Sequence, residues 1–199
     1  MNLNKYREKI GEDLVSQGWT VLDDFFDPDL IRQLTDECRQ QQRAGQLKEA
    51  GIGRADLHVV EKSIRSDQIR WLESGQSAAV DRFLACQEEL RDYFNRHLFL
   101  GLQESEQHFA FYPPGGFYHQ HLDRFKREGS RVISSVLYLN PDWMPGHGGE
   151  LRLNLGPRCN DIAPVSNRYV LFISAQILHE VLETHVERMS LTGWFKRRL

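Results

Sequence analysis

From Glu106 onward the sequence consists of short β-rich runs separated by Gly, Pro and Asn. Closely spaced strands of this kind favour a sandwich in which two sheets bury their apolar faces against each other. We therefore predict that this half of the chain is nearly all strand, with no internal repeat. The runs are HFAFY, FYHQHLD, VISSVLYLN, ELRLNL, YVLFIS, LHEVLE and SLTGWF.

The region before these runs has the periodicity of helices that cover a sheet with one apolar face. The first helix is predicted over 3–17, and a strand over 19–25 follows it. Asp27 is a good N-cap for a second helix, with Pro28 at its first position. A serine-capped third helix is predicted over 77–98.

Helices followed by strands predict a mostly β fold with some α structure. We expect a double-stranded β-helix of the jelly-roll or cupin type, with the N-terminal helices packed on one outer face. A length of 199 residues suits one compact domain. The expected organisation is a single domain, with a helix-rich support region over 1–104 and a catalytic core over 105–199.

The composition narrows the partners and the compartment. There are 25 Lys and Arg against 28 Asp and Glu, and the formal charge of −3 gives no basic field for nucleic acid. Three widely spaced cysteines, Cys38, Cys86 and Cys159, fit neither a zinc site nor a disulfide framework. No apolar run is long enough for a membrane span or a signal peptide. We expect a cytoplasmic monomer that binds neither nucleic acid nor membrane.

The triplet His121-Leu122-Asp123 is the first candidate for chemistry. In a strand its two polar side chains leave the same face, so both can reach one ion, while Leu122 points into apolar packing. Such triplets also occur by chance on solvated strands. His119 would share that face, so periodicity alone permits it as a ligand in place of Asp123.

His179 strengthens the metal interpretation because it lies in the apolar run ILHEVL, where a buried imidazole needs a partner. Two imidazoles and one carboxylate form a facial set that leaves coordination positions open, as in iron(II) oxygenases. Structural zinc sites favour four protein ligands instead. Other histidines, among them His108, have no partner visible in the sequence and are interpreted as structural.

Arg188 is the fourth candidate, in the apolar-flanked sequence VERMSLTGWF. If its strand lies beside the His179 strand, the guanidinium can bind a carboxylate through two charge-assisted hydrogen bonds. A dicarboxylate cosubstrate would then chelate iron at one end and pair with Arg188 at the other.

These pieces together resemble a known family. HFAFYPPGGFYHQHLDRF, SVLYLNPDW, HGGELRL, LHEV and ERMSLTGWF, with IRSDQIRWLE upstream, are similar to the 2-oxoglutarate-dependent prolyl 4-hydroxylases, especially the hypoxia-factor type. The resemblance covers 19–197. It implies that His121, Asp123 and His179 bind iron, and that Arg188 pairs with the distal carboxylate of 2-oxoglutarate. Tyr138 would hydrogen-bond that same carboxylate.

The resemblance also implies a wall for the pocket. Tyr112 and Trp194 fall at pocket-lining positions, although either aromatic side chain is equally compatible with core packing. Arg131 is a candidate for substrate docking. The family pattern argues against His119 as a ligand, so we interpret it as a pocket or outer-shell residue. The glycine-rich stretch 44–60 is a candidate lid over the site.

The activity implied is 4-hydroxylation of a prolyl residue in an intracellular protein. The reaction would use Fe(II), 2-oxoglutarate and O2, with ascorbate as reductant, and would give succinate and CO2. Compact bacterial members of the family suggest a loop of elongation factor Tu as the target. Oxygen sensing is a further expected role. One alternative is a dioxygenase that acts on a free amino acid, another side chain or a small metabolite. A second alternative is a non-catalytic, metal-binding jelly-roll module.

Overall fold

The computed structural model describes residues 1–51, 63–123 and 130–198. Its helices are α1 (Leu3–Ser16), α2 (Pro28–Arg43) and α3 (Ala78–Leu98). Its strands are β1 (Trp19–Asp23), β2 (Lys48–Glu49), β3 (Gln68–Trp71), β4 (Glu104–Tyr112), β5 (Tyr118–His121), β6 (Arg131–Tyr138), β7 (Leu151–Leu155), β8 (Arg158–Ile162), β9 (Arg168–Ile173), β10 (Leu178–Val181) and β11 (Arg188–Lys196). None of the helices in these ranges is long and apolar enough to cross a bilayer.

Two helix starts follow from local hydrogen-bond chemistry. The Asp27 side chain accepts from the backbone N–H of Asp29 at 2.9 Å, and Pro28 occupies the first turn of α2. The Ser77 hydroxyl accepts from the N–H of Val80 at 3.1 Å. These bonds satisfy backbone donors that have no partner within the helix. Both predicted caps are confirmed.

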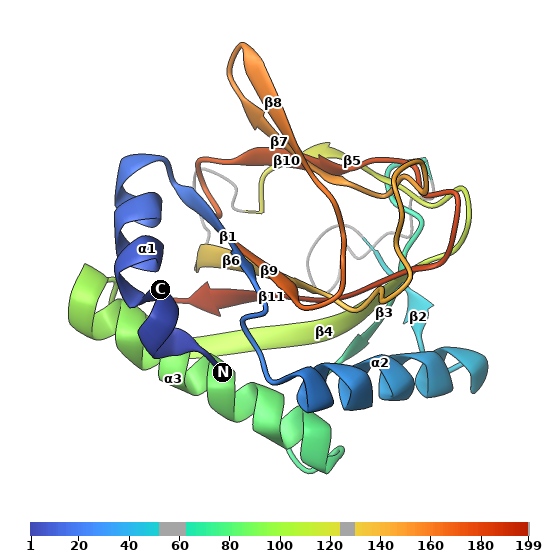
Figure 1. The fold of residues 1–199 in the computed structure, drawn as a ribbon, viewed down its shortest axis with the longest axis horizontal. Coiled ribbons are helices and arrows are strands. Elements are labelled where there is room, and N and C mark those ends of the chain that lie inside the picture. The colour runs from blue at the N-terminus through green and yellow to red at the C-terminus, as the bar shows by residue number, and fades with distance from the viewer. Residues whose placement is uncertain (52–62, 124–129, 199) are drawn as a thin grey trace.

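The strands form two antiparallel sheets (Figure 1). The major sheet has the order β1-β9-β6-β11-β4-β3-β2, and the minor sheet has the order β5-β10-β7-β8. In Figure 1 the minor sheet lies above the major sheet, while α2 and α3 lie on the opposite side of the major sheet. The predicted fold class, mostly β and of jelly-roll type with helices on one face, is confirmed.

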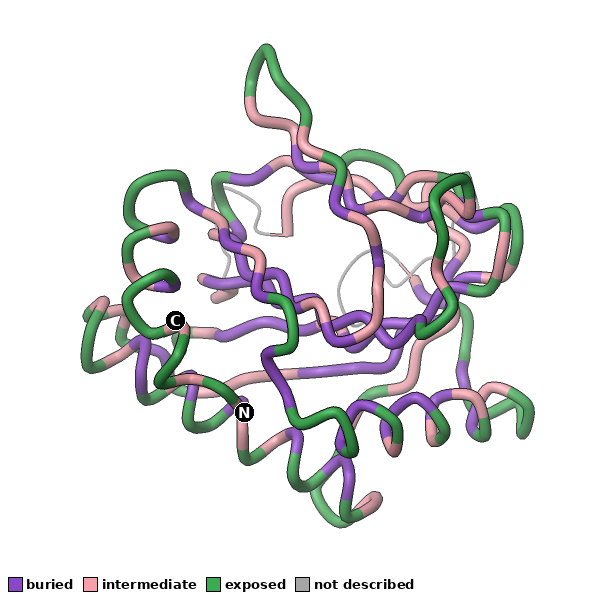
Figure 2. The backbone as a smooth tube through the Cα atoms, viewed as in Figure 1, coloured by how far each residue is buried: buried purple, intermediate pink, exposed green. Residues whose placement is uncertain are grey.

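Each predicted run contains a strand, but the sequence reading missed β8. This strand, Arg158–Ile162, is largely exposed and polar, so it lacks the alternation that marks a half-buried strand. It pairs with β7, and the two form a hairpin that projects from the top of the molecule in Figure 1. Figure 2 shows that the tip of this hairpin is exposed, whereas the central strands are buried.

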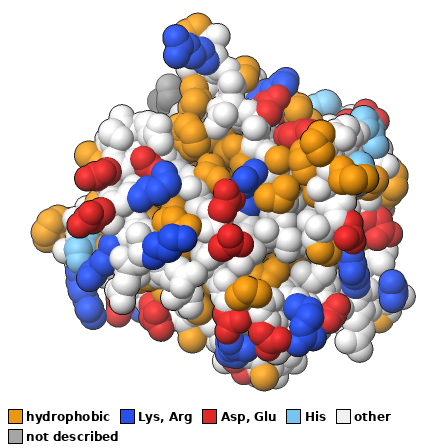
Figure 3. All heavy atoms as spheres, in the orientation of Figure 1, with side chains coloured by type: hydrophobic (Ala, Val, Ile, Leu, Met, Phe, Trp, Pro, Cys, Tyr) orange, Lys and Arg blue, Asp and Glu red, His pale blue; other side chains and the backbone are white. Residues whose placement is uncertain are grey.

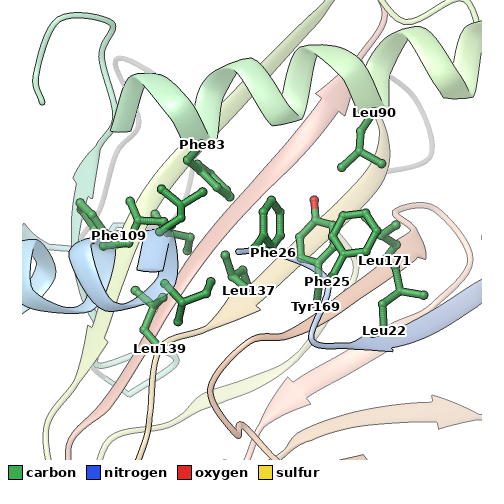
Figure 4. Packing of buried hydrophobic residues seen from close by; sticks show 14 of the residues in the cluster. Leu22, Phe25, Phe26, Phe83, Leu90, Phe109, Leu137, Leu139, Tyr169 and Leu171 are labelled. Atoms are coloured by element: carbon green, nitrogen blue, oxygen red, sulfur yellow. The ribbon is translucent and has the colours of Figure 1, made fainter. Parts of the chain in front are cut away.

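The largest hydrophobic cluster lies between the helices and the outer face of the major sheet (Figure 4). Phe83 of α3 contacts Phe26 with ring centroids 5.6 Å apart, and Phe26 meets the Tyr169 ring of β9 edge-on at 5.2 Å. All three rings are essentially inaccessible to solvent. The apolar face predicted for the third helix is therefore the one that packs on the sheet.

The side chains of β11 alternate between two layers. Met189, Leu191 and Phe195 belong to the helix-side cluster. The residues between them point to the other side, into the inner layer that separates the two sheets. Arg188 and Trp194 therefore belong to the inner layer. On the outer surface, the face viewed in Figure 3 carries acidic and basic side chains intermixed.

Candidate functional site

His121, Asp123 and His179 come together in the inner layer, with one ligand atom from each lying within 4.8 Å of the others. The two histidines are directly paired residues of the neighbouring strands β5 and β10. Their ring centroids are 4.3 Å apart. The register of the minor sheet thus places the two predicted histidine ligands side by side.

Asp123 reaches the set differently from the prediction. Strand β5 ends at His121, and Asp123 lies in the bend that follows, so strand alternation does not aim its side chain. Its carboxylate oxygens nevertheless lie 3.6 Å from Nε2 of each histidine. Leu122 is only half-buried and does not belong to the hydrophobic clusters of the described residues.

Both imidazoles are held in the same tautomer. His121 Nδ1 lies 2.7 Å from the carbonyl oxygen of His119, and His179 Nδ1 lies 3.0 Å from that of Ile177. Because a carbonyl can only accept, each Nδ1 carries the proton. A neutral imidazole with its proton on Nδ1 has its lone pair on Nε2, and each Nε2 lies on the side of Asp123, which is the arrangement that a metal ligand requires.

His119 is not a ligand. Its imidazole is exposed and packs against Phe117, with ring centroids 4.6 Å apart. The expected position in the pocket or outer shell is met by its backbone and not by its exposed side chain. Its contribution is the backbone carbonyl that fixes His121.

The electrostatics of the cluster suit a divalent cation. Burial lowers the pKa of His179 to about 4, so this imidazole is neutral at neutral pH. Burial alone would raise the pKa of Asp123, but the neighbouring His179, His121 and Ser134 outweigh it and hold that pKa below its usual range. A carboxylate and two imidazoles leave coordination positions open for further ligands. The residues present therefore fit Fe(II).

Arg188 is 2 % exposed and makes no ion pair with a carboxylate of the described residues. Its Nε donates to the carbonyl of Gly149 at 2.7 Å. Its guanidinium carbon lies 4.9 Å from the ring centroid of Tyr112 and 5.1 Å from that of Tyr138. A buried cation without an anionic partner is costly, so this position calls for an anionic ligand.

The strand that carries Arg188 does not lie beside the His179 strand. β11 pairs with β4 and β6 in the major sheet, whereas β10 lies in the minor sheet. Arg188 thus approaches the inner layer from the opposite sheet. The Phe172 ring of the major sheet contacts the His179 ring at 4.6 Å and shares a hydrophobic cluster with Tyr138, which links the two halves of the site.

Tyr138 completes the anion site. Its hydroxyl is buried and has no hydrogen-bond partner among the described residues. Burial raises the pKa of Tyr138 to about 12, so the hydroxyl stays protonated and can donate. A free donor beside an unpaired guanidinium fits a carboxylate. The residues present therefore fit the distal end of 2-oxoglutarate.

Comparison with known proteins agrees with this geometry. Residues 107–196 match the family model of the 2OG-Fe(II) oxygenase superfamily. A prolyl-4-hydroxylase from Pseudomonas putida is 43% identical in sequence, with a TM-score of 0.89, and the match covers 97% of this chain and 100% of that chain. The chain belongs to the 2-oxoglutarate/Fe(II)-dependent prolyl 4-hydroxylase family. It is accordingly a dioxygenase that uses Fe(II), 2-oxoglutarate and O2.

Other solved structures share the fold of this dioxygenase. A prolyl 4-hydroxylase from Phytophthora capsici is 26% identical with a TM-score of 0.80, covering 98% of this chain and 63% of that chain. A Trichoplax adhaerens prolyl hydroxylase, in complex with a hypoxia inducible factor peptide fragment, is 23% identical with a TM-score of 0.85. That match covers 96% of this chain and 89% of that chain.

The two aromatic residues assigned to the pocket wall of the dioxygenase lie in different surroundings. Tyr112 is buried and faces Arg188 from the neighbouring strand, where the two residues are register partners. Trp194 is 8 % exposed, and its Nε1 has no hydrogen-bond partner among the described residues. Arg131 stacks on the Trp194 ring at 3.4 Å and pairs with Glu106 at 3.1 Å.

His108, which the sequence analysis interprets as structural, belongs to the same aromatic group. It is 2 % exposed, and its ring lies 4.9 Å from that of Trp71 and 5.5 Å from that of Trp194. Its Nδ1 has no partner among the described residues. Trp71 is 44% exposed, so this group extends from the inner layer to the surface.

Two residues that the sequence analysis did not identify, Tyr118 and Arg65, pack around the metal ligand His121. The Tyr118 ring stacks on His121 with centroids 3.7 Å apart, and the Arg65 guanidinium lies 4.3 Å from the centroid of the Tyr118 ring. Arg65 also forms a partly buried ion pair of 2.6 Å with Asp67. The only sequence signal was the spacing of Arg65 and Asp67 on one face of an extended stretch.

The candidate lid over 44–60 stays a prediction. Residues 44–51 follow the end of α2 and include the short strand β2. The remainder of the stretch, 52–60, lies outside the described residues.

Proposed function

We propose that this protein hydroxylates C4 of a prolyl residue in an intracellular protein. The observation that carries the proposal is the similarity to the P. putida prolyl-4-hydroxylase over the whole length of both chains. Two structural features support it, namely the His-Asp-His cluster and the unpaired Arg188 on the facing sheet. Both are requirements of a reaction that uses a metal and a dicarboxylate.

In this proposal Nε2 of His121, Nε2 of His179 and the Asp123 carboxylate hold Fe(II). Arg188 and Tyr138 hold the distal carboxylate of 2-oxoglutarate. When bound, iron and 2-oxoglutarate supply the activation of O2 that places one oxygen atom on proline and the other on succinate, with loss of CO2.

The protein contributes placement and exclusion of water. Tyr118 and Phe172 pack against the two ligand imidazoles and leave no room for solvent on those faces. Tyr112 covers the Arg188 guanidinium. Apolar surroundings strengthen the ion pair between Arg188 and its carboxylate and protect a reactive site from side reactions.

The substrate is proposed to be a protein segment, and a loop of elongation factor Tu is the candidate target. The exposed edge of Trp71 and the Arg131 guanidinium stacked on Trp194 offer a surface for such a segment. The Trichoplax enzyme shares the fold and was determined with a peptide fragment, so the fold accommodates a peptide. We further propose a cytoplasmic monomer that uses ascorbate as reductant and binds neither nucleic acid nor membrane.

The test is aerobic incubation with Fe(II), ascorbate, labelled 2-oxoglutarate and either purified elongation factor Tu or cell extract. Succinate release and a proline that gains one oxygen atom are the expected results. His179→Ala should abolish both, while His185→Ala is the matched control, because His185 is exposed and outside the ligand cluster.

Other outcomes identify the alternatives. Turnover of 2-oxoglutarate with no modified proline indicates a free amino acid, another side chain or a metabolite as substrate. Metal binding without any turnover indicates a non-catalytic module. Because O2 is a cosubstrate, the dependence of the hydroxylation rate on dissolved O2 tests a role in oxygen sensing.

A further inference from the structure

A chain of two buried hydroxyl groups ends on the Asp123 carboxylate. Ser134 Oγ lies 2.6 Å from Asp123 Oδ2 and 2.8 Å from Ser174 Oγ. Ser134 is 1 % exposed and Ser174 is fully buried. Ser134 lies on β6 of the major sheet, and Ser174 directly follows β9 of that sheet. The chain therefore connects the major sheet to a ligand that follows a strand of the minor sheet.

The direction of the two hydrogen bonds follows from the number of protons. An ionised carboxylate can only accept, so Ser134 donates its single hydroxyl proton to Asp123. Ser174 must then donate to the oxygen of Ser134. Hydrogen bonds in such a chain polarise one another in the same sense, which strengthens the bond to the carboxylate.

The orientation of the Asp123 side chain depends on its hydrogen bond from Ser134 more than the orientation of either histidine depends on a single hydrogen bond. His121 and His179 lie within paired strands, and each is also fixed by a backbone carbonyl. Asp123 lies outside β5 in a bend, and among the described residues Ser134 donates the one hydrogen bond that reaches its side chain. The serine thereby occupies Oδ2 and limits the directions in which the carboxylate can offer a lone pair to an ion.

We propose that Ser134 is a positioning residue that holds the Asp123 carboxylate in its metal-binding orientation, and that Ser174 in turn orients the Ser134 hydroxyl. This inference rests on the proposed metal site and adds an outer layer to it. Outer-shell partners of this kind commonly contribute tenfold to hundredfold to metal affinity.

Ser135 provides a matched control. It is as buried as its neighbour, at 1 % exposure, but points to the opposite face of β6, where it lies 3.4 Å from the carbonyl of Gly193. Removing either hydroxyl perturbs the same strand. Only Ser134 contacts the metal ligand.

The experiment is titration with Mn(II) alone, without O2, 2-oxoglutarate or peptide, followed by calorimetry. Ser134→Val should weaken Mn(II) binding by roughly tenfold to hundredfold relative to the parent. Ser134→Thr should bind Mn(II) as the parent does, because threonine has the shape of valine but keeps the hydroxyl. Ser174→Ala should weaken binding by a smaller factor. Ser135→Ala should leave binding unchanged. Melting of the metal-free variants verifies that each one is folded.

A second readout uses the anaerobic Fe(II) and 2-oxoglutarate complex, whose visible charge-transfer absorption should shift in Ser134→Val and return in Ser134→Thr. Equal Mn(II) affinity in the folded Thr and Val variants would overturn the positioning role while leaving the metal site intact. Equal weakening in Ser135→Ala would overturn it as well. A parent protein that binds neither Mn(II) nor Fe(II) would overturn the metal site itself, and the role of Ser134 with it.

Discussion

The backbone of Gly149 and the side chain of Arg188 lie directly against each other. The Gly149 carbonyl accepts from Arg188 Nε at 2.7 Å, and a Cβ at Gly149 would lie 2.9 Å from Arg188 Cδ. Gly149 also has a φ of +75°, which L side chains rarely adopt. This glycine therefore both binds the arginine and leaves room for it.

Gly149→Ala should displace Arg188 and raise the KM for 2-oxoglutarate by roughly tenfold, equivalent to about 1.4 kcal/mol, with little effect on Mn(II) affinity. Gly146→Ala is the control, because Gly146 has a φ of +91° but a Cβ added there would meet nothing within 4 Å. It carries the same backbone strain without the contact. Equal KM values in the two variants would contradict the explanation.

Arg188→Ala should weaken 2-oxoglutarate binding far more than metal binding. Two charge-assisted hydrogen bonds at roughly 1.5 to 3 kcal/mol each correspond to a loss of about a hundredfold or more. His179→Ala should instead abolish both metal and cosubstrate binding. The check is a pair of titrations, one with Mn(II) and one with 2-oxoglutarate in the presence of Mn(II). Unchanged cosubstrate kinetics in Arg188→Ala would refute the assignment.

Tyr138→Phe should weaken cosubstrate binding without lowering the stability of the cosubstrate-free protein. The Tyr138 hydroxyl is buried without a partner among the described residues, so its removal should leave the free energy of unfolding of the cosubstrate-free protein unchanged or raise it by about 1 kcal/mol. Binding of 2-oxoglutarate should weaken, because the donor to its carboxylate is lost. Tyr169→Phe is the control, because the Tyr169 hydroxyl donates to Gln87 at 2.9 Å. Removing that hydrogen bond should lower the free energy of unfolding measured in urea.

Burial lowers the pKa of His108 from 6.5 to about 3. A depressed histidine pKa means that the unfolded chain takes up a proton below pH 6.5 that the folded chain does not. The free energy of unfolding is therefore highest above about pH 6.5, as far as this group is concerned, and falls as the pH drops toward 3. Between pH 7 and pH 5 the expected fall is about 2 kcal/mol. His108→Met should remove that part of the pH dependence. Urea unfolding at the two pH values measures it, and identical slopes in both proteins would argue against a buried neutral imidazole.

Phe83→Ala should lower the free energy of unfolding by about 3 to 5 kcal/mol, because Phe83 is fully buried between α3 and the major sheet. Val15→Ala on α1 is the control, since Val15 is 77% exposed and should change stability by less than about 0.5 kcal/mol. Denaturant unfolding monitored by circular dichroism gives both values. A small effect at Phe83 would mean that the core relaxes around the change.

Much of the fold was readable from local chemistry. Asp27, Pro28 and Ser77 mark helix starts by their own hydrogen bonding and backbone geometry, and the apolar face of α3 follows from helical spacing. The metal ligands were also predictable, because His121 and His179 stand out as polar residues within apolar or alternating runs. These signals are local, so one sequence suffices to find them.

Relationships between distant strands were not readable in this way. The position of Arg188 depends on β11 pairing with β4 and β6, which no local pattern specifies. The orientation of Asp123 depends on Ser134, a serine whose neighbour Ser135 is identical in type and differs only in the face it occupies. Strand β8 was missed, and the partners of His108 were not visible, for a similar reason, since their surroundings are made by other segments.

The opposed placement of the metal ligands and Arg188 has a consequence for cosubstrate choice. The metal ligands belong to the minor sheet or its margin, whereas the guanidinium belongs to the major sheet. A diacid that touches both must span the thickness between them, and sheet-to-sheet packing distances are nearly constant. The architecture thus requires the length of the diacid to match the spacing between the two sheets.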